Sequence, residues 1–83
     1  MTNEQVEKFL QKETTNTNPV KINFKTRSAI LGIFIKLEDY TELKSKNLWR
    51  IVSESRIDEF KKTKNSGLAR IFNGVEITRL EKV

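Results

Sequence analysis

Cysteine and histidine are both absent from this chain of 83 residues. Without cysteine there is no disulfide framework and no thiolate metal site, and without histidine the commonest general base and zinc ligand is missing. Only carboxylates, lysines and hydroxyl groups remain for chemistry, and no enzyme motif accompanies them. We therefore expect a protein that is not an enzyme and holds neither metal nor cofactor.

Long apolar runs are missing as well. The longest one, residues 29–35, is far shorter than the roughly 20 residues that a membrane-spanning helix requires. The first residues, MTNEQVEKFLQKE, include acidic side chains and lack the apolar core of a secretory signal. The expectation is a cytoplasmic protein with no membrane segment.

The length allows one domain over residues 1–83 and one hydrophobic core. Charge is unbalanced, since 16 Lys and Arg face 11 Asp and Glu, for a formal net charge of +5. A basic surface favours polyanions such as RNA or DNA, or an acidic protein surface. Solubility alone accounts for such an excess equally well.

The N-terminus carries the signature of a short amphipathic helix over residues 3–13. Thr2 stands three residues before Gln5, the spacing of a capping box, and an apolar stripe then lies on one helical face. The members of that stripe are Val6, Phe9 and Leu10. So short a helix needs something to dock on, which is more readily its own sheet than a partner. A polar linker, residues 14–19, follows.

A β-barrel-like core is predicted over residues 20–80, and its first strands are well marked. Residues 20–25 alternate apolar and polar side chains, as in a strand with one buried face. Residues 29–37 are almost continuously apolar, which indicates a long strand that bends at Gly32. In the run 48–52 we expect Trp49 in the core.

The remaining segments are less regular. Residues 41–46 are charged and are predicted to form a middle strand or ribbon. Residues 54–62 have the spacing of a short helix. Asn73 and Gly74 suit a type I′ hairpin turn, although such a turn would pair apolar with acidic side chains. A bulge, or a longer loop with a separate strand over residues 75–80, is the alternative.

These elements predict a mainly β (α+β) domain. Its expected architecture is a small, strongly bent, five-stranded antiparallel sheet or an open barrel of the Sm-like or SH3-like kind. An N-terminal helix packs across one end, and a short helix is inserted near residues 54–62.

Residues 3–60 resemble the Sm-like small β-barrel family, especially its bacterial Hfq branch of RNA chaperones. The likeness rests on the N-terminal helix, the strand VKINF, the glycine of the second strand (Gly32), the acidic turn residue Asp39, and the apolar run ending in IVSESRI. Asp39 lies one residue further from the glycine than the family pattern has it. The Tyr-Lys-His triplet of the family's uridine pocket and subunit interface has no counterpart, because it would fall on Ser53, Glu54 and Ser55.

The resemblance implies a nucleic-acid site beside the acidic turn. Tyr40 is the aromatic side chain there that would stack on a base, and the cations available for phosphate are Lys44, Lys46 and Arg50. The alternative for Tyr40 is a ring packed on the rim of the core with its hydroxyl in water.

The hypothesis is a small binding module that holds single-stranded RNA through basic side chains. The alternative is a protein–protein interaction adaptor that uses a sheet edge or the apolar helix stripe. An enzyme working with carboxylates is disfavoured, since acidic residues in turns are usually solvated; those carboxylates are Glu38, Asp39, Glu42 and Glu54. The oligomeric state stays open.

Overall fold

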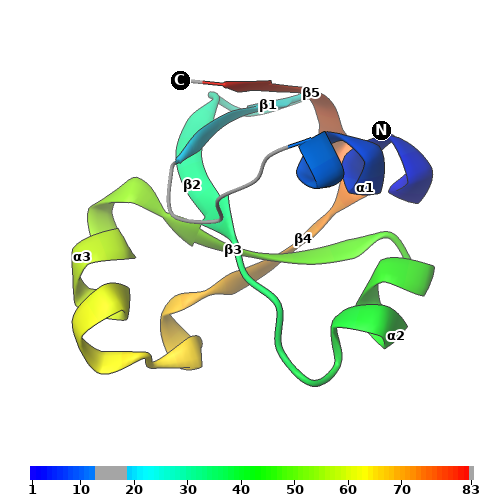
Figure 1. Ribbon diagram of the computed structural model, residues 1–83. Coiled ribbons are helices and arrows are strands. Elements are labelled where there is room, and N and C mark those ends of the chain that lie inside the picture. The colour runs from blue at the N-terminus through cyan, green and yellow to red at the C-terminus, as the bar shows by residue number, and fades with distance from the viewer. Residues whose placement is uncertain (13–18, 83) are drawn as a thin grey trace.

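The computed structural model describes residues 1–12 and 19–82 (Figure 1). The strands are β1 (Val20–Phe24), β2 (Ile30–Phe34), β3 (Leu48–Ser53), β4 (Arg70–Asn73) and β5 (Ile77–Lys82). The helices are α1 (Asn3–Lys12), α2 (Tyr40–Ser45) and α3 (Glu54–Thr63), and two 3₁₀ turns, η1 (Ser66–Leu68) and η2 (Gly74–Glu76), flank β4. Apart from Pro19, the predicted linker lies outside the described residues.

The five strands form one antiparallel sheet in the order β4-β3-β2-β1-β5. After β4 the chain continues into β5, which pairs with β1. In this pairing Val20 lies opposite Lys82 and Ile22 lies opposite Leu80. The edges of the sheet are therefore β4 and β5, which are neighbours in sequence but not in the sheet. This arrangement confirms the predicted α+β fold with a five-stranded antiparallel sheet and an N-terminal helix.

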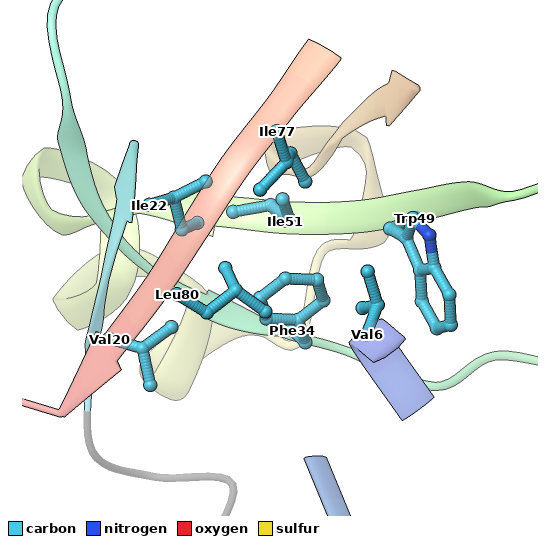
Figure 2. Close-up of a cluster of buried hydrophobic side chains, with 8 residues drawn as sticks. All are labelled: Val6, Val20, Ile22, Phe34, Trp49, Ile51, Ile77 and Leu80. Carbon is cyan, nitrogen blue, oxygen red and sulfur yellow. The ribbon is translucent and has the colours of Figure 1, made fainter. Parts of the chain in front are cut away.

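The main core lies on the face of the sheet that curls inward. Figure 2 shows its buried side chains, which are Val6, Val20, Ile22, Phe34, Trp49, Ile51, Ile77 and Leu80. The indole of Trp49 meets the Phe34 ring edge to face, with 6.1 Å between centroids, and Trp49 is only 2% exposed. The prediction that this tryptophan belongs to the core is confirmed.

A second, smaller core covers the opposite face of β2 and β3. It consists of Ile33, Val52 and Ile57, with Phe60 packed against it. Ile57 and Phe60 belong to α3, so the helix predicted over residues 54–62 exists and covers the outer face of the sheet. Burial on both faces explains why β2 and β3 are so rich in apolar residues.

Helix α1 docks on its own sheet. Val6 is fully buried in the main core, and Phe9 and Leu10 pack against it. The capping box is present, because the Gln5 amide donates to Thr2 Oγ1 at 3.2 Å and the Thr2 amide donates to Gln5 Oε1 at 2.9 Å. The apolar stripe is thus used inside the molecule.

Gly32 allows a close approach of β3. A Cβ atom at this position would lie 2.8 Å from both Ile51 Cγ2 and the carbonyl oxygen of Val52. The strand itself is shorter than predicted, since β2 covers Ile30–Phe34 rather than residues 29–37. Only a residue without a side chain fits where β2 and β3 approach each other so closely.

The prediction of a strand over residues 41–46 is wrong, because this segment forms α2. Glu42 and Lys46 stand four residues apart and form an ion pair at 3.5 Å, a spacing that stabilises a helix. Ser45 Oγ also donates to the carbonyl oxygen of Glu42 at 2.6 Å. Asn47 then takes a left-handed conformation with φ 59° and ends the segment.

The predicted type I′ hairpin at Asn73 and Gly74 is also wrong. Gly74 has no positive φ and begins the 3₁₀ turn η2. Its missing side chain is needed for packing instead, because a Cβ would lie 2.1 Å from Asn47 Oδ1. The structure follows the alternative, a longer connection followed by a separate strand, β5.

Candidate functional site

The predicted site residues lie on α2 and β3. Tyr40, Lys44 and Lys46 belong to α2 and its end, and Arg50 belongs to β3. The Tyr40 ring packs against Trp49 in a T-shaped contact, with 6.1 Å between centroids, and burial raises the pKa of its hydroxyl. Tyr40 therefore lies on the rim of the main core, with the ammonium of Lys44 5.7 Å from its ring centroid.

Each cation of this predicted site is paired with a carboxylate. Arg50 donates to both carboxylate oxygens of Asp39, at 3.3 and 2.6 Å. This hydrogen bond lowers the pKa of Asp39 and raises that of Arg50. Lys46 is paired with Glu42 at 3.5 Å.

Lys44 forms an ion pair with Glu7 of α1. The pKa of Lys44 is raised, mainly by the hydrogen bond that its ammonium donates to this carboxylate. Lys44, Lys46 and Arg50, the three cations predicted to bind phosphate, are therefore each paired with a carboxylate. The surface around α2 is thus close to electrically balanced.

A different group of cations, from the β1–β2 connection, α3 and β4, gathers around one hollow. A pocket of about 310 Å³, which we call the arginine pocket, is lined by side chains from β2, β3, β4, α3 and the β1–β2 connection. Three of them are arginines, namely Arg27, Arg56 and Arg70, and two are serines, Ser53 and Ser55. The apolar lining is supplied by Ile30, Ile51, Leu68 and Phe72, and no carboxylate of the described residues lines the pocket.

Strand pairing brings these arginines together. Arg70 is the residue opposite Ile51 in the β3–β4 register, so both side chains belong to the same face of the sheet. Arg56 lies in the first turn of α3, and Arg27 lies in the connection between β1 and β2. Within residues 1–12 and 19–82, none of these arginines forms an ion pair.

Arg27 is held over an aromatic pair. The rings of Phe24 and Phe72 lie 5.5 Å apart between centroids, tilted by 35°. The Arg27 guanidinium lies 5.1 Å from the Phe24 centroid and 5.6 Å from that of Phe72, at the distance of cation–π contacts. A flat cationic group is therefore fixed on an apolar platform without being neutralised.

A second hollow adjoins the first along the edge strand. This β4 pocket has a volume of about 330 Å³ and shares Arg27, Arg70 and Phe72 with the arginine pocket. Its other lining residues are Phe24, Thr26, Ile71, Asn73 and Glu76. The two pockets therefore adjoin each other, and Arg27, Arg70 and Phe72 lie between them.

Sequence reasoning missed this cluster. Arg27, Arg56 and Arg70 are far apart in the chain, and each stands alone between residues of other kinds. The signal that could have found them is the strand register, which puts Arg70 beside Ile51. The predicted hairpin at Asn73 and Gly74 pairs this segment with the residues after Gly74, whereas β4 pairs with β3.

Other classes of site find little support in the part of the chain that the structure describes. Across residues 1–12 and 19–82 there is no group of three Asp or Glu residues placed to hold a metal ion. In those same ranges no helix has both the length and the apolar character needed to traverse a bilayer.

Comparison with known proteins gives no match to a family model, to a curated protein or to a solved structure. The function has to be argued from the residues.

Proposed function

We propose that this protein is a small cytoplasmic binding module, without enzymatic activity, that holds single-stranded nucleic acid, RNA in particular. The observation that carries the proposal is the arginine pocket, where Arg27, Arg56 and Arg70 line a partly apolar hollow. Within residues 1–12 and 19–82, no carboxylate lines it. A guanidinium group can donate two parallel hydrogen bonds to the oxygens of one phosphate, and it can also stack on a base. Both properties match a flexible strand with exposed bases.

The aromatic platform supports a single strand rather than a duplex. Phe24 and Phe72 are only partly buried, and the guanidinium of Arg27 lies over them. Unpaired bases stack on such surfaces, whereas the bases of a duplex are already stacked on one another. The formal net charge of +5 and the resemblance to the Sm-like family point the same way.

The main phosphate contacts are then Arg27, Arg56 and Arg70 rather than the cations predicted from the sequence. Lys44, Lys46 and Arg50 would have to leave a carboxylate before binding a phosphate, and this exchange weakens the gain. Arg27, Arg56 and Arg70 form no ion pair among the described residues. Tyr40 and its neighbours remain a second contact region for a longer strand.

The test is a binding titration with a short labelled RNA at increasing salt. We expect affinity to fall as salt rises, and each of Arg27→Ala, Arg56→Ala and Arg70→Ala to reduce the slope of log K against log salt by about 0.7. Lys8→Ala is the matched control, since it removes one exposed positive charge from α1, which does not line either pocket. Absence of binding at low salt, or equal effects of all four variants, would overturn the proposal.

A protein-interaction adaptor is the second candidate, favoured by the open edge of β4. This strand pairs only with β3 in the described sheet, and Ile71 on it is 47% exposed. An extended peptide could add to that edge through backbone hydrogen bonds. Arg56→Ala distinguishes the candidates, because it removes a positive charge from the arginine pocket and leaves the edge of β4 unchanged. It should weaken RNA binding and preserve the binding of a partner strand.

A further inference from the structure

The β4 pocket contains two polar groups that phosphate binding does not explain. Asn73 and Glu76 line it, beside the aromatic platform of Phe24 and Phe72. A carboxylate repels phosphate, so Glu76 is out of place in a pocket that serves the backbone alone. Carboxylates and carboxamides do, however, recognise the polar edges of bases.

The side chain of Asn73 has a fixed orientation. Its Oδ1 accepts a hydrogen bond from the backbone amide of Val75 at 2.9 Å. Because that amide is a donor, the oxygen must face it, and the Nδ2 group is the one left to donate elsewhere. The same bond holds the turn η2 in shape, so the donor is presented by a rigid part of the fold.

The backbone of Glu76 is held by a hydrogen bond, whereas its side chain is exposed. Its carbonyl oxygen accepts a hydrogen bond from the Lys25 amide at 3.0 Å, which ties η2 to the end of β1. The side chain is exposed and forms no ion pair or hydrogen bond within the two described ranges. Two carboxylate oxygens are thus available beside one amide donor.

The pattern of donors and acceptors favours one base. Guanine has two neighbouring donors, N1–H and the N2 amino group, which a carboxylate can accept with its two oxygens, and O6 and N7 are acceptors for an amide donor. Adenine and cytosine offer an amino group next to a ring acceptor, and uracil has one N–H between two carbonyl groups. Only guanine satisfies both oxygens of a carboxylate at once.

We propose that the β4 pocket selects guanine. The base stacks on the guanidinium of Arg27, which lies over the two phenylalanine rings. Glu76 accepts from N1–H and N2–H, and Asn73 donates to an acceptor of the base. Arg70, which lines both pockets, meets the adjoining phosphate. This inference rests on the proposed binding of nucleic acid and adds base selectivity to it.

The experiment compares short uridine RNAs in which the central nucleotide is guanosine, inosine, adenosine or uridine. Inosine is the sharpest comparison, since it differs from guanosine only by the missing N2 amino group. We expect the guanosine strand to bind the wild-type protein about tenfold or more tightly than the other three. Equal affinity for the guanosine and inosine strands overturns the inference.

Two variants assign the selectivity to its residues. Glu76→Gln should remove the preference for guanosine, and Glu38→Gln, which changes an exposed carboxylate outside both pockets, should keep it. Asn73→Asp retains an oxygen for the Val75 amide but replaces the donor, so it should weaken guanosine binding without unfolding the turn. A preference that survives both Glu76→Gln and Asn73→Asp contradicts the assignment.

The outcomes separate this inference from the proposed function. Binding of all strands with equal affinity, dependent on the arginines, sustains the proposed function and overturns guanine selection. Guanosine monophosphate is tested alone as well. If it binds in a manner that depends on Glu76 while no strand binds, the guanine site stands and strand binding is overturned.

Discussion

At the scale of single residues, Asn47 organises one end of the molecule. Its Nδ2 donates to the carbonyl oxygen of Met1 at 2.9 Å, and its Oδ1 accepts from the indole nitrogen of Trp49 at 2.8 Å. Its carbonyl oxygen accepts from the Gly74 amide at 2.7 Å. One left-handed residue thus satisfies the buried indole and joins the N-terminus, β3 and η2.

Gly74→Ala tests this junction. The new Cβ would lie 2.1 Å from Asn47 Oδ1, so either the asparagine or the turn must move and the bond to the indole is strained. We expect the free energy of unfolding in urea to fall by about 2 kcal/mol. Gly67→Ala is the matched control, because its Cβ would meet only the exposed Asn65 side chain, at 3.1 Å. Equal losses in the two variants would contradict the role of Asn47.

The Asp39–Arg50 pair makes a pH-dependent contribution. The hydrogen bond from Arg50 lowers the pKa of Asp39 in the folded state. The stabilisation is therefore complete above the unfolded-state pKa, about 4, and is lost as the pH falls through the lower folded-state value. Asp39→Asn should lower stability near neutral pH and match the wild type in strong acid.

Urea unfolding measured from about pH 6 down to about pH 2 follows this contribution. Arg50→Gln should give the same flattened profile as Asp39→Asn, since it removes the other half of the pair. Profiles that stay parallel to the wild type at every pH would show that the pair does not form.

At the scale of elements, α1 depends on the sheet. Its Thr2–Gln5 capping box fixes where it starts, but a helix of ten residues is too short to persist alone in water. Val6 enters the main core beside Trp49, as Figure 2 shows. The helix therefore closes the open end of the curled sheet and protects the indole.

Val6→Ala measures the strength of this docking. Removing two buried methyl groups should lower the free energy of unfolding by about 2 kcal/mol, and the loss should appear in urea denaturation. Gln11→Ala, an exposed change on the same helix, should have little effect. If Val6→Ala were as mild as Gln11→Ala, α1 would not be part of the cooperative fold.

Much of the element level was predictable, for reasons that are local. The alternation in β1, the capping box before α1 and the spacing of Ile57 and Phe60 each lie within a few residues. The failures have non-local causes. Residues 41–46, predicted as a strand or ribbon, form α2. Gly74 is predicted as a turn residue, whereas its missing side chain leaves room for Asn47.

At the scale of the whole molecule, charge is unevenly distributed. Lys44, Lys46 and Arg50 are each paired with an acid, whereas Arg27, Arg56 and Arg70 share a pocket that no carboxylate of the described residues lines. This segregation could not be predicted, because it follows from the strand order rather than from composition. The candidate site therefore lies on β4, α3 and the β1–β2 connection rather than on α2.

Sulfate should reveal the unbalanced pocket without any RNA. A divalent anion that binds the folded protein raises its melting temperature, and we expect about 4 °C more than sodium chloride of equal ionic strength produces. Sulfate also stabilises proteins in general, so the comparison with variants decides. Arg70→Ala should lose most of the increment and Lys8→Ala should keep it; equal increments would exclude anion binding at this pocket.

The pairing of β1 with β5 also governs how the protein reaches its native state. Val20 meets Lys82 across the sheet, so the pair closes a loop that contains nearly all the other elements. Contacts between such distant segments slow folding, since the entropy of loop closure is lost before they form. During synthesis, β5 must leave the ribosome before the sheet can be completed. Until then, α1 has only part of its docking surface.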